Sequence, residues 1–153
     1  MKSIKMVDLK GQYDLIKGEL DASLDSVLNT TSFINGPAVK EFQSNLQKYL
    51  NVKHVIPCAN GTDALQLALM SLNLHPGDEV ITTDFTFAST AEVVQLMGLK
   101  LKLVDINEET FNIDPLSIKK AITTKTKVII PVHLFGQPAE MDKIIEISKE
   151  HKL

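Results

Sequence analysis

The segment "VIPCANGTDALQLAL", residues 55–69, decides how this chain folds. Its apolar start predicts a short strand over residues 54–58 ("HVIPC"), and the leucines that follow predict a helix over residues 62–72. Between them lies a small polar turn, Asn60-Gly61-Thr62. A strand that passes directly into a helix is the repeating unit of α/β proteins, so the fold class depends on whether the pattern recurs.

The alternation does recur along the rest of the chain. Further strands are predicted over residues 79–82, 101–106 and 127–132. Helices are predicted over residues 87–97, from Asp114-Pro115 to Ile122, and from Met141 to Ile147, and two amphipathic helices precede the alternation, over residues 13–28 and 39–50. The sequence therefore predicts an α/β fold in one folding unit, with a mostly parallel sheet covered by helices on both faces.

Ligands of such sheets bind where the strands end at their carboxyl termini. Those ends fall at residues 58–62, 83–87, 105 and 133–137. The alternation stops on a helix, in "SKEHKL", where a returning strand is usual, so more chain is expected after Leu153.

Composition excludes several classes of function. The net charge of -3 disfavours nucleic acid as a partner, and all 16 basic residues are lysines, so no guanidinium group is present to bind an anion. No apolar run approaches the roughly 20 residues of a membrane helix, and the N-terminus has no signal-peptide pattern. The single cysteine, Cys58, predicts a reduced, cytoplasmic setting, and the four scattered histidines predict no metal site.

The turn before the helix at residues 62–72 has two readings. Gly61 would let the backbone turn closely, and the N–H groups of Thr62 and Asp63 with the Thr62 hydroxyl would bind an anion such as phosphate at the positive end of the helix. Simple capping, with Asn60 or Thr62 as the N-cap and Asp63 in the first turn, is equally compatible with the spacing.

Three other candidates lie at predicted strand ends. Phe85 and Phe87 lie two residues apart, so one ring could stack on a flat ligand, although ordinary core packing is the commoner role. His133 could act as a base or ligand, but a hydrogen-bonded structural histidine is the more frequent case. Gln137 could reach a ligand or cap the following helix.

The loop "FINGP" joins the first two predicted helices and has two readings as well. Phe33, Ile34 and Gly36-Pro37 put apolar side chains beside a rigid turn. The loop could pack on a partner chain, or it could simply connect the two helices.

Six segments, taken in order, resemble the DegT/DnrJ/EryC1/StrS family of sugar aminotransferases. They are "MVDLKGQY", "FINGPAVKEF", "ANGTDALQLAL", "HPGDEVITTDFTFAST", "VDINEETFNIDP" and "AITTKTKVIIPVHLFGQPAEMDKI". The resemblance implies a fold-type I enzyme, dependent on pyridoxal 5′-phosphate (PLP), that transfers an amino group from glutamate to a nucleotide-linked keto sugar. Among such sugars, the resemblance favours a UDP-linked 3-keto uronate or related N-acetyl sugar as the substrate.

The resemblance also implies roles for individual residues. Gly61, Thr62 and Asp63 would bind the PLP phosphate, and Phe87 would stack on the pyridine ring. His133 and Gln137 would lie near the cofactor. Phe33, Asn35 and Gly36 would lie near the active site of a homodimer. Small departures from the family pattern, Gln43 and Leu101, do not involve these residues.

On the same resemblance, residues 1–153 would be the N-terminal part of the PLP-binding large domain, with the N-terminal helices in residues 1–50. The Schiff-base lysine, the acid that pairs with the pyridine nitrogen and the C-terminal domain would all follow Leu153, so this chain alone would be inactive. Two alternatives stay open: a sugar dehydratase of the same family, in which histidine replaces the lysine, and a non-catalytic α/β domain that binds a phosphate ligand or regulates.

Overall fold

The computed structural model describes residues 6–153, and their contacts divide the chain into two compact units, Met1–Pro57 and Cys58–Leu153. The sequence pattern led us to expect one folding unit. The prediction that the N-terminus carries no signal peptide begins on residues 1–5, which lie outside the described part. Within residues 6–153, no helix is both long and apolar enough to cross a membrane.

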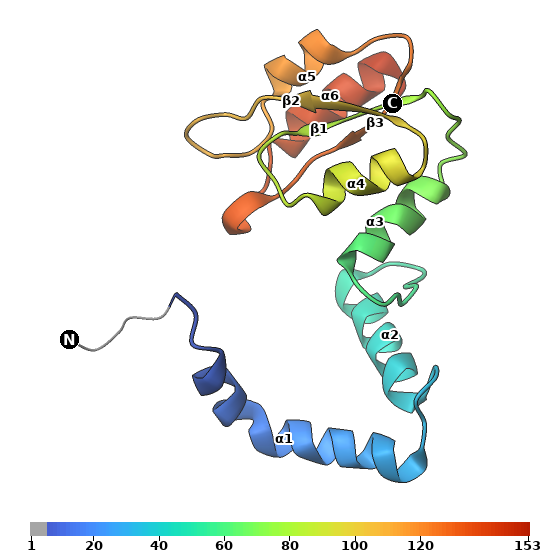
Figure 1. Ribbon diagram of the computed structural model, residues 1–153, viewed down its shortest axis with the longest axis vertical. Helices are drawn as coiled ribbons and strands as arrows, with labels where there is room; N and C mark the ends of the chain where they lie inside the picture. Colours follow the sequence, from blue (N-terminus) through green and yellow to red (C-terminus); the bar gives the residue numbers. More distant parts are fainter. Residues whose placement is uncertain (1–5) are drawn as a thin grey trace, which may run out of the picture. The chain divides into compact units, whose positions relative to one another are not determined.

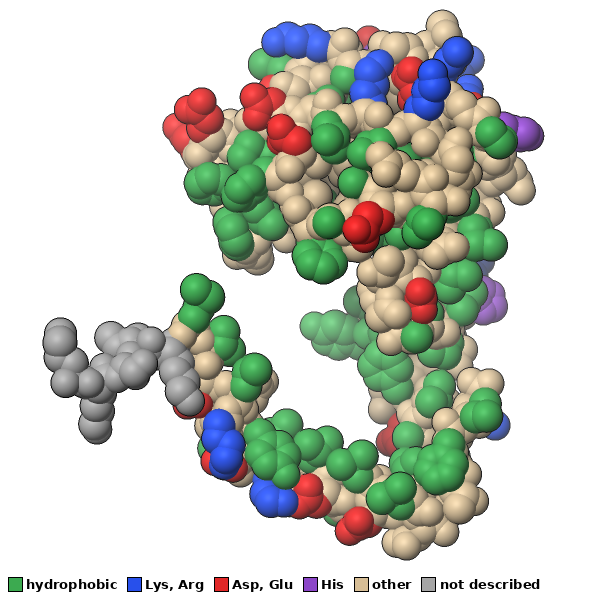
Figure 2. Space-filling view, in the orientation of Figure 1, with side chains coloured by type: hydrophobic (Ala, Val, Ile, Leu, Met, Phe, Trp, Pro, Cys, Tyr) green, Lys and Arg blue, Asp and Glu red, His purple; other side chains and the backbone are tan. Residues whose placement is uncertain are grey.

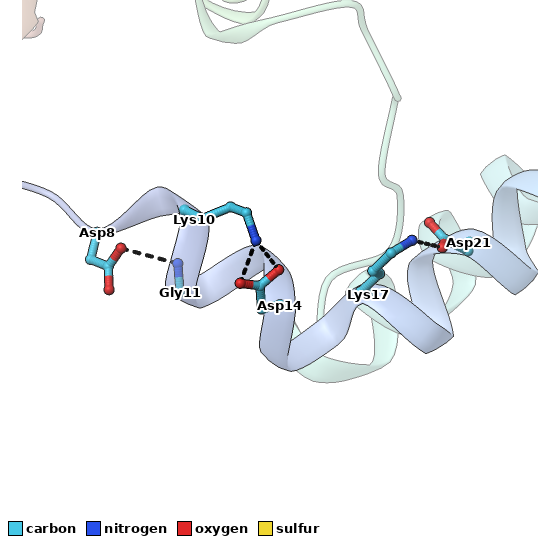
Figure 3. Close-up of polar contacts among 6 residues, drawn as sticks. All are labelled: Asp8, Lys10, Gly11, Asp14, Lys17 and Asp21. Atoms are coloured by element: carbon cyan, nitrogen blue, oxygen red, sulfur yellow. Dashed lines mark hydrogen bonds and ion pairs between the residues drawn. The ribbon is translucent and has the colours of Figure 1, made fainter.

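The first unit contains two helices, α1 (Leu9–Thr30) and α2 (Pro37–Leu50). The side chain of Asp8 caps α1 by accepting a hydrogen bond of 3.0 Å from the N–H of Gly11, and ion pairs four residues apart join Lys10 to Asp14 and Lys17 to Asp21 (Figure 3). Such exposed pairs contribute little to stability, because water screens them. No residue of either helix is buried. The predicted helices are thus confirmed, but this unit has no buried core within the described residues.

The second unit is a three-stranded parallel sheet with helices on both faces (Figure 1). Its strand order is β2-β1-β3, and the predicted α/β fold is confirmed. In chain order the elements are α3 (Gly61–Met70), β1 (Glu79–Thr83), α4 (Ser89–Leu96), β2 (Lys100–Val104), α5 (Pro115–Ala121), β3 (Thr126–Ile130), the short 3₁₀ helix η1 (Leu134–Gly136) and α6 (Met141–His151).

Alternation along the central strand β1 divides the core into two clusters. Val80 points into one cluster with residues of α3 and α4, and Ile81 points into the other with residues of α5 and α6. Successive side chains of a strand face opposite sides of the sheet, which explains this division. Figure 1 shows α4 on one side of the sheet and α5 and α6 on the other. The central strand β1 is buried from Val80 to Thr83, as its place between two strands and two layers of helices requires.

The strand predicted over residues 54–58 is wrong. These residues form neither strand nor helix, and Ile56 is exposed. A strand exists only where a neighbour accepts and donates its backbone hydrogen bonds, and no described strand pairs with this segment. An apolar run is therefore not sufficient for a strand, because it does not specify a second strand to pair with.

The amino-terminal edge of the sheet is held by one carboxylate, that of Glu79. Its Oε2 accepts hydrogen bonds from the Thr123 hydroxyl at 2.6 Å and the Thr126 hydroxyl at 3.2 Å, and it lies 3.4 Å from Nζ of Lys102. The hydrogen bond from Thr123, followed by the charge of Lys102, lowers the pKa of Glu79 below its ordinary value of 4.5, against the opposing effect of burial. Ionised Glu79 therefore stabilises the edge at which β1, β2 and β3 begin.

This carboxylate predicts a pH-dependent stability. A carboxylate with a depressed pKa contributes stability above its unfolded-state pKa and loses it as the pH falls through its folded-state pKa, so the loss should begin below about pH 4.5. We expect the free energy of unfolding to fall less steeply between about pH 5 and pH 3 in Glu79→Gln than in the unsubstituted chain. Urea denaturation across this range measures it, with the exposed Glu108→Gln as control. Equal slopes for the two variants would contradict the assignment.

Candidate functional site

The start of α3 combines a helix cap with free hydrogen-bond donors. Oδ1 of Asn60 accepts from the N–H of Asp63 at 2.9 Å, and the Asn60 carbonyl accepts from Ala64 at 3.1 Å. The bond from Ala64 is the first of the helix's own ladder, so only one of the four N–H groups that a helix start leaves open, that of Asp63, is used. The N–H groups of Gly61 and Thr62 and the Thr62 hydroxyl have no hydrogen-bond partner among residues 6–153. Capping and anion binding are therefore compatible at this turn.

Asp63 differs from its predicted role. Its N–H is taken by Asn60, and its Oδ2 accepts a hydrogen bond of 3.2 Å from Nδ2 of the same residue. The expectation that Asp63 offers a free N–H is wrong, because the side chain of an N-cap Asn reaches the third residue of the helix. The free donors are those of Gly61 and Thr62, one position earlier than predicted.

Gly61 also differs from expectation, since the turn does not require a glycine. Its φ lies outside the left-handed region, in which only Gly77, Gly98 and Gly136 are found among the described glycines. A Cβ placed on Gly61 would meet no atom within 4 Å. The missing side chain instead leaves open space directly beside two free N–H donors. A group that approaches the backbone closely, such as phosphate, would occupy this space.

Of the two phenylalanines after β1, only Phe85 has an aromatic neighbour. Its ring centroid lies 5.7 Å from that of Phe111, whereas the Phe87 side chain is 77% exposed. Core packing is therefore wrong for Phe87, because the loop between β1 and α4 carries it outside both core clusters. The Phe87 ring is free to stack on a flat ligand.

His133 and Gln137 flank η1, in the loop after β3. Nδ1 of His133 accepts a hydrogen bond of 3.0 Å from the N–H of Ala139, which is the structural role, and this leaves Nε2 as the proton-bearing nitrogen of the neutral ring. Gln137 does not cap α6, because the N-cap of that helix is Glu140. The Gln137 side chain is exposed and has no hydrogen-bond partner in the described residues.

Sheet topology brings some of these residues together. Because β1 and β3 are parallel neighbours, the loops that carry Phe87 and the segment 133–137 leave the sheet at the same edge. No hydrogen bond within residues 6–153 joins the start of α3 to Phe87, His133 or Gln137. Helix α3 joins the sheet instead through its apolar residues, among them Leu65 and Leu69.

One residue at this edge was not predicted, namely Asn112. It is 3% exposed, and its side chain bonds to the loop after β3. The only signal in the sequence is a polar residue between two apolar ones, Phe111 and Ile113, which is too common to single it out.

The "FINGP" loop of the first unit is shaped by backbone geometry. Asn35 adopts a left-handed φ of 49°, and Gly36 is the N-cap of α2. A Cβ on Gly36 would lie 2.5 Å from the carbonyl oxygen of Ser32, so glycine is required here. Phe33 is exposed, and it lines an open hollow of about 590 Å³ between the last turns of α1 and the start of α2. Contact of this loop with substrate or partner stays a prediction.

No group of three or more His, Cys, Asp or Glu side chains placed to hold a metal ion occurs in residues 6–153. The free donors at the start of α3 and the exposed ring of Phe87 are two features of the second unit that could hold a ligand.

Comparisons with known proteins agree over nearly the whole chain. The sequence pattern of the DegT/DnrJ/EryC1/StrS aminotransferase family matches residues 14–153. The chain is 47% identical over 148 residues to the UDP-2-acetamido-2-deoxy-3-oxo-D-glucuronate aminotransferase of Pseudomonas aeruginosa, covering 97% of this chain and 41% of that protein. It is 46% identical over 151 residues to a pleiotropic regulatory protein of Geobacillus stearothermophilus, covering 99% and 41%.

Solved structures give the same result for the fold. DesV of S. venezuelae matches with a TM-score of 0.95 and 35% identity, covering 100% of this chain and 41% of that one. NtdA of Bacillus subtilis, solved with the bound cofactor PMP, matches with a TM-score of 0.85 and 41% identity, covering 92% and 32%. The chain thus spans about 41% of the length of the two curated relatives from Pseudomonas aeruginosa and Geobacillus stearothermophilus. It belongs to the DegT/DnrJ/EryC1/StrS aminotransferase family.

Proposed function

We propose that this chain is the N-terminal part of the PLP-binding large domain of an aminotransferase, which transfers an amino group from glutamate to a nucleotide-linked keto sugar in amino-sugar or surface-polysaccharide biosynthesis. Membership of the family and the 47% identity to an aminotransferase of a UDP-linked 3-oxo sugar support this reading. A UDP-linked 3-keto sugar is accordingly the proposed substrate.

The proposal depends above all on the start of α3. The N–H groups of Gly61 and Thr62 and the Thr62 hydroxyl are free in the described part of the chain, and the space beside Gly61 is open. They would hold the cofactor phosphate at the positive end of the helix. When bound, PLP supplies an electron sink that the protein's own side chains lack. Asp63 acts indirectly, because it helps Asn60 to hold the turn.

Other residues of this chain would orient the cofactor and substrate. Phe87 would stack on the pyridine ring, for which its 77% exposure leaves room. His133 and Gln137 would contribute from the loop after β3. The loop with Phe33, Asn35 and Gly36 would contact the substrate or the second subunit of a homodimer. A cytoplasmic enzyme is proposed, as the single cysteine indicates.

None of the 16 lysines is proposed to carry PLP, so the chain alone would not transaminate. All lysines in residues 6–153 are exposed except the half-buried Lys102. That residue pairs with Glu79, the first residue of β1, whereas ligands bind at the carboxyl ends of the strands. PLP fixed to a single lysine of this chain after borohydride reduction, detected by mass spectrometry, would overturn this statement.

A regulatory role is the second candidate, because a relative at 46% identity is called a pleiotropic regulatory protein. A regulator that still binds the cofactor and a sugar dehydratase of the family would both be compatible with a phosphate site in this chain. The aminotransferase and the dehydratase differ in whether lysine or histidine serves as the catalytic residue. A regulator that has lost cofactor binding would differ from both enzymes in the PMP experiment that follows.

The phosphate site can be tested with pyridoxamine 5′-phosphate (PMP), which has no aldehyde to react with surface lysines. We expect PMP to shift the backbone amide resonances of Gly61 and Thr62 in ¹H–¹⁵N spectra of the ¹⁵N-labelled chain, because these two N–H groups would donate to the phosphate. Pyridoxamine, which lacks the phosphate, is the matched control and should leave both resonances in place.

The outcomes decide whether this turn is a phosphate site. Shifts with PMP alone support the proposal. Equal shifts with both compounds would show that the phosphate is not what binds. An absence of shifts at millimolar PMP would overturn the phosphate site and favour a regulator that has lost cofactor binding.

A further inference from the structure

The loop between β2 and α5 is held rigidly by its own hydrogen bonds. An isolated bridge pairs Ile106 with Ile113, and the Asn107 N–H donates to the Asn112 carbonyl at 2.8 Å. Oδ1 of Asn107 accepts from the N–H groups of Glu109 and Thr110 at 3.0 and 3.1 Å. The conformation of this loop is therefore defined by bonds within the loop itself.

From this loop the side chain of Asn112 enters the segment after β3. Its Oδ1 accepts from the N–H of Leu134 at 2.9 Å, and its Nδ2 donates to the carbonyls of Gln137 at 3.0 Å and Pro138 at 3.3 Å. The residue is 3% exposed, so these bonds are shielded from water. One side chain thus binds backbone groups at the first residue of η1 and in the two residues that follow it.

Aromatic contacts join the same segments. The ring centroid of Phe111 lies 5.7 Å from that of Phe85 and 6.1 Å from that of Phe135, so one ring comes from each of the loops that follow β1, β2 and β3. Phe111 and Phe135 have left-handed φ values of 59° and 53°. Residues with a side chain rarely adopt such backbone, which persists only where the surroundings hold it. Figure 2 shows hydrophobic side chains gathered on the side of this unit where η1 lies in Figure 1.

We propose that Asn112 is a positioning residue of the cofactor site: through its three hydrogen bonds it sets the backbone of residues 133–138, and with it the placement of His133 and Gln137. That His133 and Gln137 contact the cofactor rests on the proposed function. The three hydrogen bonds of the Asn112 side chain are a property of this chain whatever it binds. The His133 ring is fixed by the N–H of Ala139, at the far end of the segment that Asn112 binds. Loss of the Asn112 hydrogen bonds should therefore let the His133 ring change its orientation.

The critical variant is Asn112→Asp, which keeps the size and the acceptor for Leu134 but loses the donor to Gln137 and Pro138 and places an oxygen against two carbonyls. Asn107→Asp is the matched control in the same loop, because only Oδ1 of Asn107 is used. We expect Asn112→Asp to speed amide hydrogen exchange at Leu134 and Ala139 at least about tenfold, and Asn107→Asp to change it less than about twofold.

A spectroscopic readout separates positioning from mere stabilisation. The ¹⁵N shifts of the His133 ring should report one tautomer, with the proton on Nε2, in the unsubstituted chain and in Asn107→Asp. We expect a mixture of tautomers in folded Asn112→Asp. A single unchanged tautomer in that variant, or equal exchange rates in the two variants, would overturn the proposal.

Two further measurements complete the design. If Asn112→Asp does not fold, the side-chain amide protons of Asn112 in the unsubstituted chain decide. Slow exchange of these protons with solvent supports the proposal, and exchange as fast as that of exposed amides overturns it. Addition of PMP distinguishes the two proposals. Unchanged Gly61 and Thr62 resonances in the unsubstituted chain would reject the phosphate site, whereas the exchange and tautomer data would still decide the role of Asn112.

Discussion

Replacement of Ile118 by alanine should lower the free energy of unfolding by about 2–5 kcal/mol, the range for truncating a large aliphatic side chain in a core. Ile118 lies in α5 and is fully buried against Ile81, Ile113 and Ile144. The substitution removes three carbons and leaves a cavity that the sheet, fixed by hydrogen bonds on both sides of β1, cannot close. Urea denaturation followed by far-ultraviolet circular dichroism measures the loss.

The matched control is Leu116→Ala, which makes a similar truncation two residues away in the same helix. Leu116 is 65% exposed, so this variant should lose less than about 1 kcal/mol. Similar losses in the two variants would mean that α5 does not bury Ile118 against the sheet.

Replacement of Gly61 by valine should weaken PMP binding at least about tenfold, because the side chain fills the space beside the two free donors, and one lost charge-assisted hydrogen bond of about 1.5–3 kcal/mol gives that factor. The stability of the chain should not fall. A Cβ at Gly61 meets no atom within 4 Å, and valine is no worse than glycine within a helix. Titration with PMP in ¹H–¹⁵N spectra measures the affinity, and urea denaturation measures the stability.

Gly18→Val is the control for this substitution. Gly18 lies within α1, and a Cβ there also meets no atom within 4 Å. We expect PMP binding to be unchanged in this variant. If Gly61→Val binds PMP as well as Gly18→Val does, then Gly61 only begins a helix, and the capping interpretation of the turn is sufficient.

Most helices and strands of this chain could be predicted from the sequence, because their signals are local. The N-cap at Asp114 is one example: its carboxylate accepts from the N–H groups of Leu116 and Ser117, three residues away at most. The alternation that predicted β1, β2 and β3 is local in the same sense. The strand predicted over residues 54–58 failed because pairing depends on a neighbour, which no local pattern specifies.

The candidate site divides in the same way. By itself, the sequence determined the α/β fold, the turn at Asn60-Gly61-Thr62 and the family, because residue order alone records periodicity and motifs. Only the tertiary structure decided that the free donors are those of Gly61 and Thr62, that Phe87 is outside the core and that Asn112 joins two loops. Asn112 and Gln137 are 25 residues apart in the chain, and only the parallel sheet brings their loops to one edge. Burial and hydrogen bonding between distant segments depend on that arrangement, and no short stretch of sequence contains it.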